Sequence, residues 1–290
     1  MAQLENVRVR RGARRRRRAL TGSTVTAGAL LVAMTYFPLV FMLSNSLKSG
    51  ARLATGNVFA LFTQFDARNY VDAWSGIDTS LLNTLLVAAA SVAVGVTVAA
   101  LGAYTFAQVD FRGKSLVFTA YIALLMIPWS LTLIPLFLEM KDFGFYNSWW
   151  ALILPYAATS QPLLVLIFRS FFEQVPKEVL QSARLDGARE YQVLLRVVAP
   201  LTKPILLTGT VLMCISIWGD YIWPEVILKS SSRYTVSAGL QYFVSSLGTL
   251  TANGGEVFAA YVIAIAPLLL LVGVTMRYFV GGMTAGSLKL

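Results

Sequence analysis

Asp220 is the one acidic residue that stands close to the interior of a long apolar stretch in this sequence. A carboxylate in such a place usually faces a cavity or a polar partner. We expect Asp220 either to bind hydroxyl groups and act in gating, or to hydrogen-bond a neighbouring subunit at the membrane interface. Trp218 and Trp223 flank it, and their indoles either stack on a ring-shaped ligand or join an interfacial belt.

Three further residues are candidates for a substrate path through the membrane. Asn83 either lines such a path or caps the start of its helix. Pro128 and Pro135 stand inside one apolar stretch, where proline removes a backbone hydrogen bond and kinks the helix. Kinks of this kind are common where helices line a path, and they are also common in membrane proteins generally.

Catalytic and metal-binding patterns are missing from the sequence. It has no histidine, one cysteine, and no G-x-x-x-x-G-K-[ST] stretch that would cradle a nucleotide phosphate. An enzyme acting on lipid-linked substrates would need clustered carboxylates or a histidine base. An ion-coupled secondary transporter should show buried charges or an inverted repeat. We therefore expect no enzyme activity, and no metal or cofactor bound by this chain.

The elements that must position these residues are apolar helices. Of the 290 residues, 57% are hydrophobic and 13% charged, whereas an ordinary soluble domain is about 25% charged. A membrane-spanning helix needs roughly 20 apolar residues, and lipid leaves no partner for an open backbone. We predict an all-α integral membrane protein with six transmembrane helices, at about 22–46, 81–108, 115–138, 148–170, 204–223 and 257–278.

The distribution of basic residues predicts the topology. With both termini in the cytoplasm (N-in/C-in), 18 of the 24 Lys and Arg residues fall on the cytoplasmic side and 6 on the outer side. This asymmetry follows the positive-inside rule, so the net charge of +10 indicates no nucleic-acid partner. We interpret the arginine-rich residues 1–18 as a cytoplasmic arm that fixes topology, and residues 19–290 as one transmembrane domain. Binding of the arm to anionic membrane lipids and the n-region of a signal peptide are the alternatives.

The predicted cytoplasmic loop at 172–203 contains signals for two short helices. Pro176 suits the first turn of a helix that runs to about Leu185, and Gly187 can adopt the left-handed conformation that ends it. Asp186 is placed to cap the second helix. That helix has an apolar face at i, i+3, i+4 and i+7 and should end at Pro200; the face consists of Tyr191, Leu194, Leu195 and Val198.

This loop resembles the EAA loop of ABC importer permeases, whose usual form is E-A-A-x-x-D-G-A followed by P-L-x-x-P. Gln181 and Ser182 depart from the pattern, and the missing Glu charge leaves open any salt bridge usually made there. The resemblance implies contact with an ATPase through eight residues of the loop: Ala183, Arg184, Asp186, Gly187, Ala188, Glu190, Pro200 and Leu201.

The resemblance extends over nearly the whole chain and is specific to sugar importers of the maltose and glycerol-3-phosphate type. The stretch from Trp218 to Pro224 is similar to a W-N-D-F-x-W-P signature, with Gly219 in place of Asn, and the stretch from Gly282 to Gly286 is similar to a G-x-T-A-G ending. Asn83-Thr84 matches a pair at the start of the second span, and two further segments match as well, Tyr36-Phe37-Pro38 and Met126-Ile127-Pro128.

What the resemblance implies is a type I ABC importer permease fold in the bacterial cytoplasmic membrane. This chain would form half a pore with a second, unlike permease. Two copies of an ABC ATPase would bind ATP and Mg²⁺, and an extracytoplasmic sugar-binding protein or lipoprotein would deliver the cargo. A glycerophosphodiester or a polyol is the alternative cargo.

Overall fold

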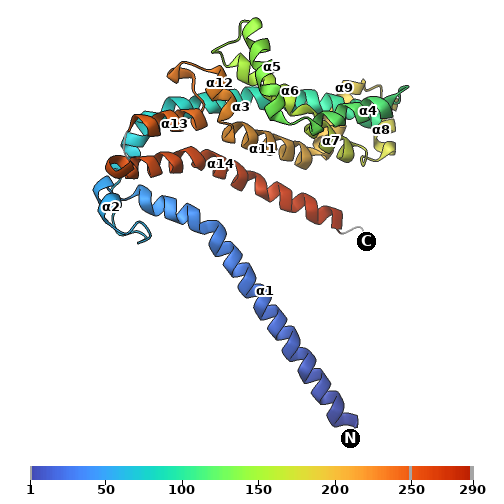
Figure 1. Cartoon of the computed structure of the whole chain (residues 1–290). Coiled ribbons are helices and arrows are strands. Elements are labelled where there is room, and N and C mark those ends of the chain that lie inside the picture. The colour runs from blue at the N-terminus through green and yellow to red at the C-terminus, as the bar shows by residue number, and fades with distance from the viewer. Residues whose placement is uncertain (1, 248–249, 288–290) are drawn as a thin grey trace. The chain divides into compact units, whose positions relative to one another are not determined.

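The computed structural model describes the backbone of residues 2–247 and 250–287, and the side chains of residues 24–247 and 253–276. All regular elements in these ranges are helices (Figure 1), which confirms the predicted all-α class. The side chains of the arginine-rich arm and of the 282–286 signature lie outside the described residues, so these two predictions concern parts that the structure describes only as helical backbone.

The chain divides into two compact units. One contains residues 1–73 and 249–262, and the other contains residues 74–248 and 263–290. Two long helices, α3 (Arg68–Gln108) and α14 (Leu250–Ser287), each pass from one unit into the other.

Three helices are long and apolar enough to cross a membrane by themselves. They are α1 (Ala2–Ser46) over Thr24–Ser46, α3 over its full length, and α14 over Asn253–Met276. The second span was predicted to begin near residue 81, but α3 begins at Arg68, so the helix includes part of the connection predicted between the first two spans. The rest of that loop carries the short helix α2 (Gly50–Thr55).

The predicted third span is not one continuous helix. It consists of α4 (Lys114–Ala123), the 3-10 turn η1 (Leu124–Met126) and α5 (Trp129–Asp142), with a bend of 97°. Pro128 stands at the break with ψ of 133°, and the residue before it is also extended. A proline disfavours the helical conformation in the preceding residue, which accounts for the position of the bend.

The predicted fourth and fifth spans are also interrupted. Helices α6 (Trp150–Thr159) and α7 (Gln161–Phe172) meet at an angle of 43°. Helix α11 (Lys203–Gly219) ends at Asp220, whose ψ is 121°, and α12 (Ile222–Ile227) follows. The prediction that residues 221–223 prolong α11 is therefore wrong. The third bent pair is formed by the helical stretch Glu190–Leu201 and α11, at an angle of 85°. The described residues contain three spanning helices, or up to six crossings if each bent pair counts as one.

The interior of the first unit is polar and is built around Lys48, which is 1% exposed. Its Nζ donates to Oδ1 of Asn45 at 2.8 Å and to the carbonyl of Val58 at 3.1 Å. Asn69 donates to the carbonyls of Ser46 and Lys48 at 2.9 and 3.0 Å. A buried ammonium is tolerated only when it is hydrogen-bonded, so these bonds hold the connection after α1 against the start of α3.

The core of the second unit is apolar and continuous. Helices α7 and α11 pack closely through Gly209, and the rings of Phe168 and Phe172 stack with centroids 6.2 Å apart. Helix α13 (Val236–Ser246) follows the turn η3 (Ser231–Arg233) and packs on α11 and α12. The buried cluster reaches from the 172–203 loop to α12, and it includes Leu152, Leu164, Leu180, Val193, Val198, Ile217, Trp223 and Ile227.

Replacing Gly209 with alanine should destabilise the protein. A Cβ there would lie 2.5 Å from two ring atoms of Phe168 and 2.9 Å from Cδ2 of Leu164, all in the buried core. Overpacking of this kind costs about 1–3 kcal/mol. We expect a lower midpoint for heat-induced aggregation of the detergent-solubilised protein. Gly273→Ala is the matched control, because a Cβ at Gly273 meets nothing within 4 Å; equal midpoints for the two variants would contradict the packing described here.

Candidate functional site

The 172–203 loop begins with α8 (Lys177–Leu185), which ends in a tight hydrogen-bonded turn. The amide of Ala188 donates to the carbonyl of Ala183 at 3.1 Å, and the amide of Gly187 donates to the carbonyl of Arg184 at 3.0 Å. This pair of bonds is the Schellman motif, in which the residue after the C-cap is left-handed. Gly187 has φ of 82°, so the predicted left-handed conformation is confirmed.

The requirement for glycine at position 187 comes from the backbone and not from crowding. A Cβ added at Gly187 would meet no atom within 4 Å. For an L-residue, the left-handed conformation costs roughly 1–2 kcal/mol, and asparagine tolerates it best among non-glycine residues.

The prediction that Asp186 caps the second helix is wrong. Asp186 is itself the C-cap of α8, and its exposed carboxylate has no hydrogen bond to any residue that the structure describes. Helix α9 (Glu190–Val193) begins three residues later than that cap would require. Its start is held by Gln192, whose Oε1 accepts from the amide of Arg189 at 2.8 Å.

The second helix has a different buried face from the one predicted. After α9 the chain forms the π-helical turn η2 (Leu194–Val198) and then α10 (Ala199–Leu201). Leu194 and Val198 are buried as expected, but Tyr191 is 52% and Leu195 65% exposed, while Val193 is fully buried. The wider turn shifts the side-chain register, and it precedes Pro200, whose missing N–H leaves a carbonyl of the turn without its helical donor.

An ionic network joins the end of α8 and the start of α9 to α3. Arg184 donates from Nε to Oε1 of Glu190 at 2.9 Å and from Nη2 to Oε2 at 3.1 Å. The hydroxyl of Tyr104, on α3, donates to Oε2 of the same carboxylate. These hydrogen bonds lower the pKa of Glu190, and the bond to Glu190 raises the pKa of Arg184. Arg184 and Glu190 therefore form an ionic contact within the loop. Gln181, which stands where the EAA motif usually has a charged Glu, cannot form one.

The loop is also continuous with the core of the second unit. Leu180 is 1% exposed and belongs to the same buried cluster as Phe168 and Phe172. At the other side of this contact, Gln108 donates from Nε2 to the carbonyl of Phe172 at 2.8 Å and joins the end of α3 to the end of α7. A displacement of the loop would therefore have to move α3 and α7 with it.

The loop nevertheless leaves large apolar side chains uncovered. Leu185 is 89% exposed, Leu195 65% and Leu201 57%. Large apolar side chains that a rigid element leaves exposed are typical of a protein interaction site. Sequence reasoning missed Tyr104 and Gln108, because only the fold brings α3 to the loop; it also passed over Leu185, although an apolar residue directly before an Asp-Gly turn was visible.

The residues predicted to line a substrate path are dispersed. Asn83 lies well inside α3, so the cap interpretation is wrong, and its Nδ2 donates to the carbonyls of Ser232 and Tyr234 at 2.9 and 3.0 Å. Pro128 and Pro135 are both exposed, the first at the break before α5 and the second inside α5.

The predicted aromatic and acidic residues around position 220 have roles within the chain. Trp223 is fully buried and donates from Nε1 to the carbonyl of Ala151 at 2.8 Å, so it neither stacks on a ligand nor joins an interfacial belt in this conformation. Trp218, half-buried, donates from Nε1 to the carbonyl of Ala264 at 3.0 Å. Asp220 accepts from the hydroxyl of Tyr156 at 2.8 Å, a partner in its own chain.

Comparison with known proteins gives one family and a set of full-length relatives. The sequence profile of the family described as "Binding-protein-dependent transport system inner membrane component" matches residues 91–284. The chain is 31% identical over 260 residues to the probable ABC transporter permease protein YurM of Bacillus subtilis (strain 168), covering 89% of this chain and 85% of that protein. It is 30% identical over 265 residues to the sulfoquinovosyl glycerol transport system permease protein SmoH of Agrobacterium fabrum, covering 91% and 92%.

A solved structure shares the fold. It is a chain of a bacterial ABC transporter involved in the import of the acidic polysaccharide alginate, with a TM-score of 0.79 and 24% sequence identity. The superposition covers 90% of this chain and 97% of that one. At this level of identity the likeness establishes a common fold.

Replacing Glu190 with glutamine should loosen the loop. The variant lacks the negative charge that attracts Arg184, and its amide oxygen is a weaker hydrogen-bond acceptor for Tyr104 than a carboxylate. Trypsin should therefore cleave after Arg184 and Arg189 faster than in the native protein. Because the pKa of Glu190 is lowered, protection by this network should be complete above about pH 4.3 and should disappear as the pH falls through the lowered value. An acid-stable protease can follow this loss.

Glu178→Gln is the control for that experiment, because Glu178 lies on α8 without an ion pair among the described side chains. Equal cleavage rates for Glu190→Gln and Glu178→Gln at neutral pH would show that the Glu190 network does not order the loop.

Proposed function

We infer the function of this chain from its family: it belongs to the binding-protein-dependent transport system inner membrane components. We propose that it is a permease subunit of an ATP-driven importer and forms half of the pore for a sugar or oligosaccharide. The name of the Agrobacterium relative, a permease for sulfoquinovosyl glycerol, supports a carbohydrate cargo.

The observation that carries this proposal is the construction of the 172–203 loop. It is a stiff helix pair, tied to α3 and α7, that presents Leu185, Leu195 and Leu201 without a cover. A loop that transmits motion needs a rigid connection to the helices that it moves. It also needs a surface that the protein driving the motion can bind. We propose that an ABC ATPase covers this surface, through the eight residues that resemble the family motif.

The proposed partners follow from this assignment. Two copies of the ATPase bind ATP and Mg²⁺, a second, unlike permease completes the pore, and an extracytoplasmic sugar-binding protein delivers the cargo. Closure of the ATPase dimer on ATP moves the loop, and the loop moves α3 and α7 as rigid bodies, which is alternating access. Energy enters through the partner ATPase and not through this chain.

The proposed topology has six crossings with both termini in the cytoplasm of a bacterial cell. Helices α4 and α5 together form one crossing, α6 and α7 form another and α11 forms a third, and the loop lies on the cytoplasmic side. Helix α11 alone, with 17 residues, has a length of about 25 Å at 1.5 Å per residue. It nearly spans the hydrocarbon layer, which supports assigning residues 190–201 to the loop and not to the crossing.

Replacing Gly187 with valine should abolish transport and leave the protein in the membrane. Valine is strained at φ of 82°, so the turn after α8 would open and Leu185 would lose its position. Uptake of the cargo by cells and the amount of membrane-inserted protein are the two measurements. Gly187→Asn is the matched variant, since asparagine tolerates this conformation, and it should keep most of the uptake. Normal uptake by the valine variant would refute the coupling role.

Isolation of the tagged protein in mild detergent tests the assignment as a whole. We expect an ABC ATPase and a second permease to co-purify and to be identified by mass. A protein that is isolated alone, in detergent that preserves other complexes, would contradict the proposed function.

A further inference from the structure

A turn between α5 and α6 is locked to the segment after α12 by one residue. Asn147 has φ of 56°, and its Oδ1 accepts from the amides of Lys229 at 2.9 Å and Ser230 at 3.2 Å. Its amide donates to the carbonyl of Ile227 at 3.0 Å, and its carbonyl accepts from Nη1 of Arg233. These bonds fix the backbone on which Tyr146 and Lys229 stand.

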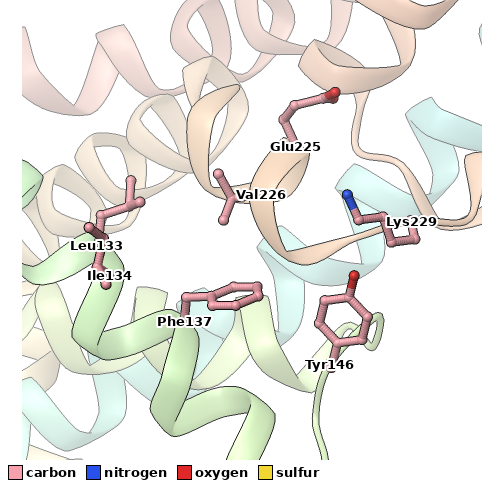
Figure 2. A pocket seen from close by; sticks show the side chains of 7 residues that line it. All are labelled: Leu133, Ile134, Phe137, Tyr146, Glu225, Val226 and Lys229. Atoms are coloured by element: carbon pink, nitrogen blue, oxygen red, sulfur yellow. The ribbon is translucent and has the colours of Figure 1, made fainter.

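A pocket of about 420 Å³ lies beside this locked turn, and Figure 2 shows its side chains. Helix α5 contributes Phe137 and two aliphatic neighbours, the turn contributes Tyr146, and α12 with the segment after it contributes Glu225 and Lys229. The rings of Phe137 and Tyr146 meet edge to face, with centroids 5.9 Å apart and planes at 89°. The volume is within the range of small-molecule sites, roughly 300–1,000 Å³.

The polar groups of this pocket are free to bind a ligand. Within the described part of the chain, the carboxylate of Glu225, the ammonium of Lys229 and the hydroxyl of Tyr146 have no hydrogen-bond or ion-pair partner. The pocket therefore offers acceptors and donors beside aromatic surface. Free charges of this kind require water or a polar ligand and are not compatible with lipid tails.

The location also suits a ligand that enters from the side opposite to the 172–203 loop. That loop leads directly into α11, and α12 follows the far end of α11, about 25 Å away at 1.5 Å for each of its 17 residues. In the proposed topology this is the outer side, where cargo is delivered.

We propose that this pocket is a subsite for one sugar ring of the cargo, on this half of the pore. The apolar face of the ring packs on Phe137 and Tyr146, and its hydroxyl groups bond to Glu225 and Lys229. Asn147 is a positioning residue that holds the two sides of the pocket at a fixed separation. The proposal rests on the proposed function and adds to it a place where this subunit contacts the transported sugar.

The test uses the complete importer, reconstituted in liposomes with its binding protein and supplied with radiolabelled maltose, trehalose or sulfoquinovosyl glycerol. Glu225→Gln and Lys229→Gln should each lower the maximal uptake rate about tenfold, equivalent to ~1.4 kcal/mol. The KM should change less, because the binding protein captures the sugar from solution. Lys229→Arg keeps a donor and should restore most of the rate.

Glu139→Gln and Lys141→Gln are the matched controls, since both residues are exposed on α5 outside the pocket. Uptake by the two pocket variants at the rate of these controls would overturn the subsite and leave the importer intact. Lost capture of sugar-free binding protein by the pocket variants would also overturn it and would identify a protein-docking surface. If the native complex imports none of the three sugars, the proposed sugar import fails, and the subsite fails with it.

Discussion

The rest of this structure depends on one constraint: each backbone N–H and C=O group within the membrane needs a hydrogen-bond partner from the protein. Lipid offers no hydrogen bond to a carbonyl that a proline has released, and this chain solves the problem with side chains from neighbouring helices. Pro155 leaves the carbonyl of Ala151 without its helical donor, and the indole N–H of Trp223 occupies that position. Breaks in the helices are therefore compensated from within the fold, and they can persist as fixed bends.

These bends determine which segments can act as levers. Helix α3 is unbroken over 41 residues and carries contacts at two levels: Tyr104 and Gln108 at its end near the loop, and Asn83 with Thr84 in its middle part. The amide of Val236 donates to Oγ1 of Thr84 at 2.6 Å, which ties α13 to the same helix. In the proposed coupling, a push on the loop would be transmitted along α3 toward the segment that precedes α13, through these contacts.

Local rules predicted the parts of the site that depend on local chemistry. The left-handed turn at Gly187 follows from glycine after a short helix, and the burial of Leu194 and Val198 follows from periodicity. Trp223 could not be placed in this way, because its burial depends on a carbonyl released 72 positions earlier in the chain. The π turn was equally invisible, since the spacing of apolar residues from 191 to 198 fits an ordinary helix. Only the packing of this segment against Leu180 and its neighbours selects the π turn, in which Val193, Leu194 and Val198 are buried.

The π turn η2 also determines how many residues the chain can place between α9 and α11. A turn of this type accommodates one residue more than an α-helical turn, and each residue added to a helix rotates everything beyond it by about 100°. Because the π turn accommodates the extra residue, the direction of Leu195 relative to α11 is the one that a regular helix with one residue fewer would not give. Removing a single residue between 194 and 198 would turn the bulge into regular helix and point Leu195 about a quarter-turn away from its present direction relative to α11.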